Sequence, residues 1–388
     1  MTNILTFNKI APIGLERFGE GYNFGEDIEN PAGIMVRSAS MHEFDLPETV
    51  LGVARAGAGV NNIPVEDYAD RGVVVFNTPG ANANSVKELV VASLFLSARK
   101  VVQGIEWAKK LKGSGDQVPS LVEKGKAEFA GPEVTGKRLG VVGLGAIGIL
   151  VANAAQKLGM EVHGYDPFLS TEAAWVLNHH IRRATTLKEI YATCDYISLH
   201  VPLNGDTRGM INTESIGQMK DGIRILNFSR AELADPDAIK SAVKSGKVSA
   251  YVVDFPTDEV LDVDGIIAIP HLGASTPESE DNCAVMAAGQ LKDYIENGSI
   301  RNAVCYPDLN AGFPEHGRVC VLHRNIPNVL TKLSGFLTAQ GLNIENMLSK
   351  SKKDYSYTVL DFDGNLTDET VAALAGVTGV IRVRTIYR

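Results

Sequence analysis

Residues 137–148 read KRLGVVGLGAIG, an apolar run that meets three glycines at the spacing of a turn between a strand and a helix. Gly143 allows a tight turn, Gly145 lets the backbone approach a pyrophosphate, and Gly148 lets the helix pack closely on the strand. Free N–H groups and the helix dipole at the start of such a helix favour a bound anion. The stretch therefore predicts a dinucleotide-binding turn, although ordinary strand-to-helix turns can share this spacing.

The residues after the glycines support a dinucleotide site. Apolar residues recur at helical spacing over 146–158, and residues 161–165 have the pattern of a second strand. Asp166 follows directly, where an acidic residue would bind the ribose diol of the adenosine and repel a 2′-phosphate. We therefore expect NAD rather than NADP as the cofactor. The alternative for Asp166 is a turn residue ahead of Pro167.

Length and charge restrict the classes of protein to which the chain can belong. Its 388 residues are enough for two or three domains, each with its own core. A formal net charge of −9 without a long basic run argues against nucleic acid or an anionic membrane as the main partner. We expect a cytoplasmic protein, because no stretch of about 20 apolar residues and no apolar amino-terminal segment occurs. The scattered cysteines favour reduced thiols and no metal site: Cys194, Cys283, Cys305 and Cys320.

Short apolar runs alternate with helical patterns along most of the chain, which is typical of α/β proteins with parallel sheets. Parallel strands that are buried on both faces have continuous apolar runs of this kind. We therefore predict the α/β fold class, with two Rossmann-like, doubly wound domains. The predicted strands are 34–37, 52–56 and 72–76 before the glycine turn, and 196–200, 224–228, 251–253 and 266–270 after it.

Two of the first strands end in arginine, at Arg37 and Arg55. Ligands of open α/β sheets collect at the carboxyl ends of strands, so both guanidinium groups are placed to meet an anionic substrate. The turn that follows, Gly57, Ala58 and Gly59, could expose N–H groups as a nest for a carboxylate. The alternative for either arginine is a surface salt bridge.

Three polar groups stand at later strand ends: Arg230, an acidic cluster at 254–259, and His271. They match the needs of hydride transfer on a 2-hydroxy acid. The histidine would take the hydroxyl proton as the hydride leaves, while the carboxylate would hold and charge the histidine. The guanidinium would bind the substrate carboxylate and polarise the carbonyl. The sequence therefore predicts an NAD-dependent dehydrogenase with a small-molecule substrate.

These residues, together with five short segments, resemble the NAD-dependent D-2-hydroxyacid dehydrogenases over nearly the whole chain. The segments are VRSA at 36–39, RAGAGV at 55–60, FNTPG at 76–80, GYDP at 164–167 and PHLGAST at 270–276.

The resemblance implies a role for individual residues. Arg230, Glu259 and His271 would be the catalytic residues. Arg37 and Arg55 would help to bind a phosphorylated substrate, with the amides of the Gly57, Ala58 and Gly59 turn holding its carboxylate. The cofactor contacts that the resemblance implies are Gly143, Gly145, Ala146, Ile147, Gly148, Asp166, His200, Val201, Pro202, Phe228, Ser229, Arg230, Asp254, His271 and Gly273.

At the catalytic acid this chain departs from the usual sequence of the family. The family usually shows Asp-Val-Phe-x-x-Glu, whereas this chain has Asp254 followed at once by Phe255. Alignment of the aspartates assigns the role to Glu259, while alignment of the aromatic residues assigns it to Asp258. We favour Glu259 and keep Asp258 as the alternative.

In this family the cofactor domain is inserted into the substrate domain. By that resemblance, residues 1–98 and 275–306 would form the substrate-binding domain and residues 99–274 the NAD-binding domain. Residues 307–317 would be a linker. The tail at 318–388 shows strand and helix patterns in an order that suggests a ferredoxin-like βαββαβ fold.

Two turns of the tail resemble the amino-acid-binding turn of an ACT domain. By that resemblance His323, Asn325 and Asn343 would bind L-serine as an effector across a subunit interface. Asn328 replaces the glycine usual in that turn. The alternative is a tail that only assembles subunits, and we expect a homodimer or homotetramer.

Two other functions remain open from the sequence. The same chemistry could act on another D-2-hydroxy acid, such as glycerate. A protein of a different class, an NAD-sensing co-regulator, could use the same fold to couple dinucleotide binding to association. A binder has no evident need for the base His271, which favours the enzyme.

Overall fold

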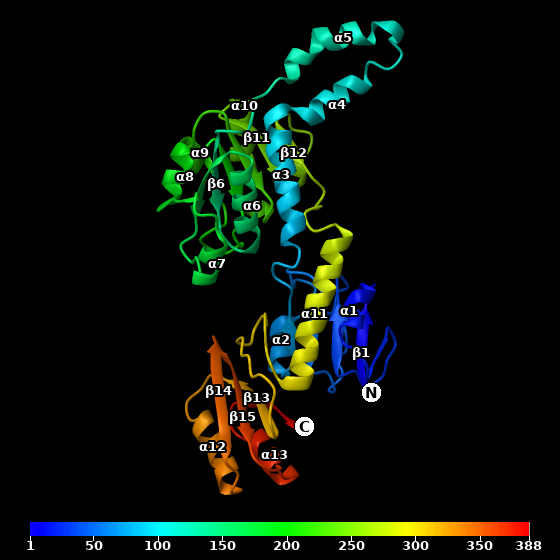
Figure 1. Cartoon of the computed structure of the whole chain (residues 1–388), viewed down its shortest axis with the longest axis vertical. Coiled ribbons are helices and arrows are strands. Elements are labelled where there is room, and N and C mark those ends of the chain that lie inside the picture. The colour runs from blue at the N-terminus through cyan, green and yellow to red at the C-terminus, as the bar shows by residue number, and fades with distance from the viewer. Residues whose placement is uncertain (388) are drawn as a thin grey trace. The chain divides into compact units, whose positions relative to one another are not determined.

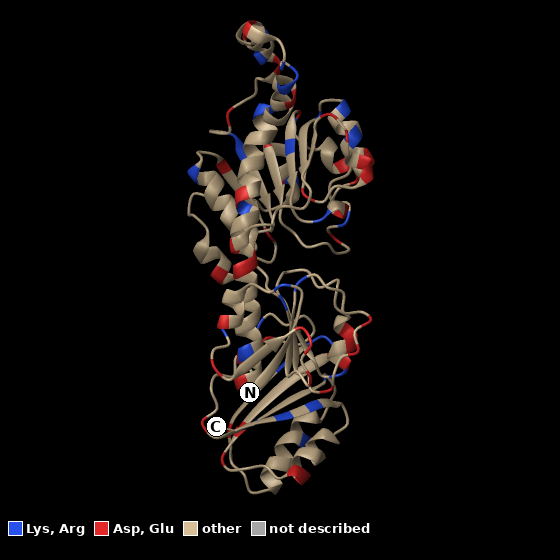
Figure 2. Ribbon diagram, turned by 90° about the vertical axis from the view of Figure 1, so that its right-hand side faces the viewer, with Lys and Arg blue, Asp and Glu red and all other residues tan. Residues whose placement is uncertain are grey.

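The computed structural model describes residues 1–387, and the chain divides into two compact units. One unit contains residues 1–81 together with 280–388, and the other contains residues 82–279. Both have parallel sheets, and the first unit carries an antiparallel sheet in addition (Figure 1). Acidic and basic residues are interspersed along both units (Figure 2). Within residues 1–387, no helix is long and apolar enough to span a membrane.

The first unit begins with five parallel strands in the order β2-β1-β3-β4-β5. All four residues of β3 are buried, as expected for a central strand with a continuous apolar run. Gly33 allows α11 to approach the sheet, because a Cβ there would lie 2.9 Å from Leu291. The elements are β1 (Thr2–Phe7), α1 (Pro12–Glu16), β2 (Tyr22–Gly25), β3 (Gly33–Val36), β4 (Gly52–Arg55), α2 (Val65–Asp70), β5 (Val74–Phe76) and α11 (Pro277–Asn297).

The tail of this unit forms a four-stranded antiparallel sheet in the order β14-β15-β13-β16. The element order is the βαββαβ order expected from the sequence. Asn328, before α12, has a φ of +68°, a left-handed conformation that glycine favours and asparagine tolerates. The elements are β13 (Gly317–Arg324), α12 (Val329–Ala339), β14 (Ile344–Lys352), β15 (Tyr355–Phe362), α13 (Asp368–Ala375) and β16 (Val380–Tyr387).

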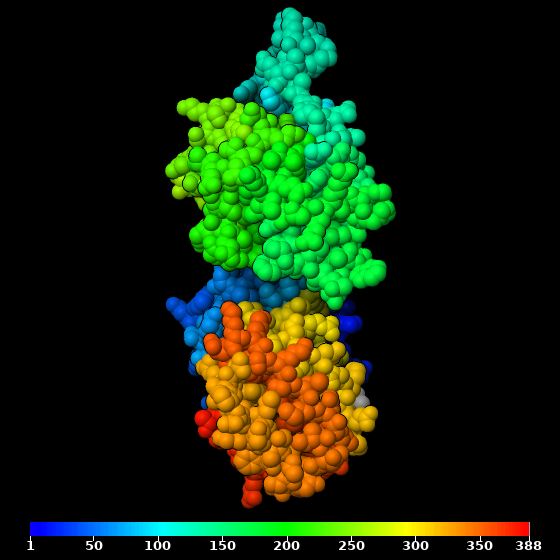
Figure 3. All heavy atoms as spheres, turned by 90° about the vertical axis from the view of Figure 1, so that its left-hand side faces the viewer, coloured from blue at the N-terminus to red at the C-terminus, as the bar shows by residue number. Residues whose placement is uncertain are grey.

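The two central strands of the tail sheet, β13 and β15, are buried on both faces. Val319 and Val321 face the core that includes Leu333 of α12, while the alternate residues Cys320 and Leu322 join the core of the first sheet. Figure 3 shows the atoms of the tail packed directly against those of the preceding residues. The connection expected to be a linker at 307–317 is itself packed, because Leu309 and Ala311 are buried in the shared core.

Arg318 joins the tail to the end of α11. Its side chain is fully buried and forms a bidentate ion pair with Asp361, at 2.6 and 2.9 Å. The same guanidinium donates to the carbonyl oxygens of Asn297, Ala311 and Gly312. The tail is therefore an integral part of the first unit rather than a separately tethered domain.

The second unit contains seven parallel strands in the order β12-β11-β10-β9-β6-β7-β8. The chain order reverses between β6 and β9, and the carboxyl ends of strands at such a point form the binding crevice of open α/β sheets. The strands are β6 (Arg138–Val142), β7 (Glu161–Tyr165), β8 (Arg182–Arg183), β9 (Tyr196–Leu199), β10 (Ile223–Asn227), β11 (Val248–Val253) and β12 (Ile266–Ala268).

Helices flank this sheet. Thr186 caps α8 and Asp235 caps α10, each accepting a backbone N–H of the first turn. Apolar side chains of α10 pack in the sheet core. The helices are α6 (Ala146–Lys157), α7 (Thr171–Val176), α8 (Leu187–Thr193), α9 (Thr213–Gly217) and α10 (Pro236–Lys244), with 3₁₀ turns η3 (Ala231–Leu233) and η4 (Asp258–Val260).

The structure moves the first domain crossing. Helix α3 (Ala83–Arg99) belongs to the second unit, where Val90 and Leu94 are buried in the core with α6. The crossing therefore falls before α3 instead of at residue 98. Lys100 takes a left-handed φ of +44° and ends α3.

A helical arm follows Lys100. It comprises α4 (Val101–Lys109), η1 (Gly115–Gln117), α5 (Val118–Gly125) and η2 (Lys126–Phe129). Figure 1 shows α4 and α5 extending away from the sheet of their unit. None of the residues in these four elements is buried.

Candidate active site

The glycine turn lies at the point where the strand order reverses. Gly143 has a φ of +90°, and a Cβ there would lie 2.5 Å from the carbonyl oxygen of His200, at the end of β9. A Cβ on Gly148 would lie 1.9 Å from the Gly143 carbonyl oxygen. Both positions therefore require glycine, while a Cβ on Gly145 would meet only open space.

The start of α6 fits an anionic group. The first N–H groups of a helix, here including those of Ala146 and Ile147, have no intrahelical acceptor. No side chain caps this helix to replace that acceptor. The open surface at Gly145 lets a ligand approach these amides, and the dipole of the helix favours negative charge there. The residues present therefore fit the pyrophosphate of a dinucleotide.

Asp166 follows β7 beside the glycine turn. Its carboxylate accepts hydrogen bonds from the backbone N–H groups of Leu144 and Phe168, both at 2.8 Å. These bonds hold the carboxylate at the edge where the adenosine ribose of a dinucleotide would lie. Phe168 itself is 91% exposed.

His200, Val201 and Pro202 follow β9. The Nε2 of His200 lies 2.8 Å from the Ser198 hydroxyl, whereas its Nδ1 is buried without a partner. Burial lowers the pKa of His200 to about 3, so this imidazole is neutral near pH 7. A neutral ring beside the turn can offer one hydrogen-bonding nitrogen to a ligand without adding charge.

The next strand end carries Arg230. The Asn227 side chain donates to the Arg230 carbonyl oxygen at 2.9 Å, and Ser229 Oγ donates to the carbonyl oxygen of Leu199 at 2.9 Å. Phe228 is buried in the core beneath them. These contacts orient the backbone, while the Arg230 guanidinium remains exposed to meet a substrate.

The loop that carries His271 is held by Asp254. The Asp254 carboxylate is buried and accepts the backbone N–H groups of Leu272 at 2.8 Å and Gly273 at 2.9 Å. A Cβ on Gly273 would lie 2.7 Å from this carboxylate, so the contact requires glycine. Burial raises the pKa of Asp254, while these two amides and the nearby His271 oppose the shift.

Phe255 contacts both Arg230 and His271. Its ring centroid lies 4.3 Å from that of His271 and 5.3 Å from the guanidinium carbon of Arg230. His271 itself has a φ of +51°, in the left-handed region. The structure therefore brings together the predicted arginine and histidine through an aromatic residue that sequence reasoning used only to judge alignment. In the sequence, this residue could have been recognised as an aromatic side chain directly after Asp254, the acidic residue that follows a predicted strand.

The predicted acid is not joined to the histidine. Glu259 lies in η4, where a hydrogen bond with the Thr257 side chain and, to a smaller extent, the charge of Lys240 lower its pKa. Within residues 1–387, no hydrogen bond or ion pair connects Glu259 or Asp258 to His271. The choice between the two acids stays a prediction.

The predicted substrate residues lie at strand ends of the first unit. Arg55 Nε donates to the carbonyl oxygen of Arg37 at 3.1 Å, and a Cβ on Gly57 would lie 2.1 Å from Arg55 Nη1. The loop after β5 supports the turn, because Asn77 Nδ2 donates to the Ala58 carbonyl oxygen at 2.6 Å. Gly59 follows directly after the bend at 56–58.

Arg37 is already paired. Its Nη2 lies 2.5 Å from a carboxylate oxygen of Glu280 on α11, and both side chains are about two-fifths exposed, at 42% and 43%. This ion pair is the alternative that the sequence left open for the arginine. An anionic ligand would have to compete with Glu280 for the guanidinium.

The predicted effector residues lie in the tail. His323 is buried, with Nδ1 at 2.8 Å from the Arg324 carbonyl oxygen and Nε2 at 2.9 Å from the Thr358 hydroxyl. The side chain of Asn325 donates to the Lys353 carbonyl oxygen at 3.0 Å. Asn343 is exposed, and its backbone N–H donates to Asp363 at 2.7 Å.

Among the described residues, no group of three or more His, Cys, Asp or Glu side chains is arranged to hold a metal ion. The sheet edge carries the glycine turn, followed at later strand ends by Arg230 and His271. The family described as D-isomer specific 2-hydroxyacid dehydrogenase, NAD binding domain, matches residues 91–273. The chain belongs to the D-2-hydroxyacid dehydrogenases and is an NAD-dependent oxidoreductase.

Within that family, similar proteins are D-3-phosphoglycerate dehydrogenases. The protein from Haemophilus influenzae is 31% identical over 392 residues, which cover 95% of this chain and 90% of that protein. The Escherichia coli K12 protein is 32% identical over 346 residues, covering 85% and 80% respectively. The Rattus norvegicus protein is 34% identical, but the match covers only 54% of its length.

A solved structure of a 3-phosphoglycerate dehydrogenase is also similar to this chain. The NAD⁺-bound 3-phosphoglycerate dehydrogenase of Entamoeba histolytica is 27% identical, with a TM-score of 0.60, over 78% of this chain and 98% of that one.

Proposed function

We propose that this enzyme oxidises 3-phospho-D-glycerate to 3-phosphooxypyruvate with NAD, the first step of L-serine synthesis. The relatives that are similar over most of the chain act on that acid by name, which supports the proposal. The observation that carries the chemistry is the contact of Arg230 and His271 with one aromatic side chain at the same sheet edge.

We assign a role to each residue at this edge. His271 accepts the proton of the substrate hydroxyl at a ring nitrogen as a hydride leaves the adjacent carbon. Arg230 binds the substrate carboxylate and stabilises negative charge on the oxygen that becomes the carbonyl. NAD, when bound, accepts the hydride. Glu259, with Asp258 as the alternative, would stabilise the charged histidine.

We infer the domain roles from the same resemblance. Residues 1–81 with 280–306 form the substrate-binding domain, and residues 82–279 form the NAD-binding domain. Arg55 and Arg37 bind the phosphate of the substrate, and the N–H groups of the turn at 57–59 bind its carboxylate.

The ion pair between Arg37 and Glu280 favours a second candidate function. An arginine that already has a carboxylate partner contributes less to the binding of a phosphate, since the ligand must displace that partner. The alternative substrate is therefore an unphosphorylated 2-oxo acid, such as hydroxypyruvate, which the enzyme would reduce to glycerate. An NAD-sensing co-regulator is disfavoured because His271 and Arg230 have no role in such a protein.

The tail is proposed to be an ACT domain that binds L-serine at His323, Asn325 and Asn343. Both ring nitrogens of His323 have partners within the domain, so serine would have to replace one of those bonds. If serine causes no heat in calorimetry and no change in initial rate, the tail only assembles subunits.

We infer that the enzyme is a homodimer or homotetramer. The exposed apolar residues Val101, Val102 and Ile105 of the helical arm support this, because a second subunit would cover them.

The test is NADH-dependent turnover against a panel of 2-oxo acids that includes 3-phosphooxypyruvate. We expect the phosphorylated acid to have the highest kcat/KM. Arg55→Ala should lower that value by roughly 10- to 150-fold, because a charge-assisted contact contributes about 1.5–3 kcal/mol, and should affect hydroxypyruvate less. Preference for an unphosphorylated acid would overturn the substrate assignment.

A further inference from the structure

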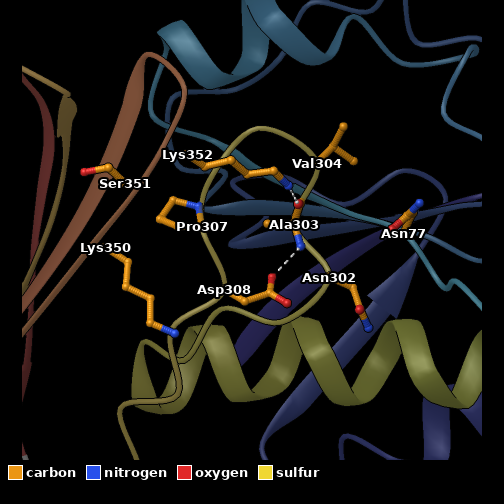
Figure 4. Close-up of a pocket in the computed structure, with 9 residues that line it drawn as sticks. All are labelled: Asn77, Asn302, Ala303, Val304, Pro307, Asp308, Lys350, Ser351 and Lys352. Carbon is orange, nitrogen blue, oxygen red and sulfur yellow. Dashed lines mark hydrogen bonds between the residues drawn. The ribbon is translucent and has the colours of Figure 1, made fainter. Parts of the chain in front are cut away.

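A pocket of about 570 Å³ lies in the first unit between strand β14 and the segment 302–308 (Figure 4). Lys350 and Lys352 line it from the strand, and Asn302 and Asp308 line it from the segment. Asn77, at the end of β5, forms part of the same wall. The reaction uses none of these side chains, so the pocket is distinct from the residues assigned to catalysis.

The two lysines give the pocket a positive charge. They are two residues apart on one strand, so their side chains leave the same face of the sheet. Figure 4 shows both of them extending from β14 toward the 302–308 segment. Lys352 Nζ donates to the Ala303 carbonyl oxygen at 2.9 Å and keeps two free N–H groups. Lys350 has no hydrogen bond or ion pair within residues 1–387.

Asp308 is the acidic group in this pocket. One of its carboxylate oxygens accepts the Ala303 backbone N–H, at a long 3.4 Å. Two ammonium groups against one carboxylate leave a net positive charge and at least five unused N–H donors. We propose that the pocket binds a small phosphate-bearing anion, with Lys350 and Lys352 as its ligands.

A chain of hydrogen bonds connects the pocket to the turn that is proposed to bind the substrate carboxylate. Asn302 Nδ2 donates to Gln290 Oε1 at 2.5 Å, and Gln290 Nε2 donates to the Asn77 carbonyl oxygen at 3.0 Å. Asn77 Nδ2 then donates to the Ala58 carbonyl oxygen at 2.6 Å. An anion against Asn302 or Asn77 therefore acts on the groups that hold the Gly57–Gly59 turn. This coupling rests on the proposed function, whereas the binding site does not.

Calorimetric titration with inorganic phosphate at constant ionic strength tests the binding site. Lys350→Gln should weaken phosphate binding about fivefold, the upper range for one exposed charge contact, and the Lys350→Gln, Lys352→Gln double variant by tenfold or more. Asp308→Asn should tighten binding, because it removes the opposing charge but keeps an oxygen for the Ala303 N–H. Lys353→Gln is the matched control, since Lys353 is a lysine in the same hairpin outside the pocket.

Phosphate that binds elsewhere, including at Arg55, does so equally in all of these variants. Identical titrations for the wild type and the double variant would therefore overturn the site. A loss of affinity in Lys353→Gln equal to that in Lys350→Gln would overturn it as well, because it would show general charge attraction only.

The coupling is tested on the KM for a 2-oxo acid, with and without phosphate. Phosphate should shift this KM by at least about twofold more in the wild type than in Lys350→Gln, a difference that competition at the substrate site cannot produce. Equal shifts would overturn the coupling and leave the binding site intact. If the protein turned over none of the acids, the proposed function would be wrong. The calorimetric comparison would still show whether the pocket binds phosphate.

Discussion

Phe255 shows how one side chain can organise the proposed catalytic edge. It contacts both the guanidinium of Arg230 and the ring of His271, while the adjacent Asp254 holds the loop after the histidine through two backbone amides. Two consecutive residues at the end of β11 therefore position His271, the proposed base: Asp254 acts through the loop and Phe255 through its ring.

His271→Ala should reduce kcat by ~10²- to 10⁴-fold, because general acid–base catalysis typically contributes that factor. NADH binding should change little, since the glycine turn and the start of α6 are separate from this ring. Steady-state kinetics and a fluorescence titration with NADH measure the two effects. Near-normal turnover would show that another group is the base.

The acid that partners His271 can be identified by comparing Glu259→Gln with Asp258→Asn. We expect Glu259→Gln to cause the larger loss of kcat and to alter the pH profile of turnover, because the partner charge stabilises the protonated histidine. Asp258→Asn serves as the matched variant one residue earlier. A larger loss in Asp258→Asn would reverse our assignment.

Two histidines of the second unit lie in or beside its sheet: His163 is buried on β7, and His200 is half-buried directly after β9. Burial lowers the pKa of both, that of His200 to about 3, and neither ring nitrogen of His163 has a partner. Each ring is therefore neutral in the folded protein at a pH where the unfolded chain would already bind a proton.

The contribution of these two neutral histidines to the free energy of unfolding should consequently be fully present above about pH 6.5, the ordinary histidine pKa. It should fall as the pH decreases toward 3. The limiting slope is about 1.4 kcal/mol per pH unit for each such histidine. Urea unfolding at pH 7 and pH 5 measures the fall, which His200→Asn should reduce. The exposed His179→Asn is the control and should leave the slope unchanged.

Apolar side chains of the helical arm are exposed, because no other described part of the chain covers them. Ile105 is 51% exposed on α4, where no residue is buried. If a second subunit covers this face, Ile105→Glu should shift the oligomer toward smaller species by placing a charge in an apolar interface. Sedimentation velocity measures the shift. Ile13→Glu, at a 48% exposed isoleucine of α1, is the control and should leave the assembly unchanged.

The tail and the first sheet form one folding unit, because they share a core and the buried Arg318 clamp. Arg318→Ala should lower the free energy of unfolding by about 3–5 kcal/mol, since it leaves Asp361 as an unpaired buried charge. Arg324→Ala removes an exposed ion pair with Asp70 and should cost no more than about 1 kcal/mol. Chemical denaturation of both variants checks the difference, and equal losses would refute the clamp.

Local sequence was sufficient for much of the fold and of the site. The parallel strands, the glycine turn and Asp166 depend on features that neighbouring residues carry: apolar runs, helical spacing and the steric freedom of glycine. Because these strands are parallel, their carboxyl ends share one edge, so the sequence alone was enough to predict Arg230 and His271 at that edge.

These local patterns could not predict contacts between residues that are far apart in the chain. Phe255 meets Arg230 and His271 only when β10, β11 and β12 lie side by side, and Arg37 meets Glu280 across more than half of the chain. The tail was expected behind a linker, yet Arg382 donates to the Val50 carbonyl oxygen, 332 residues away. Local periodicity shows which face of an element is apolar, but the partner that covers that face is chosen by the packing of the whole unit.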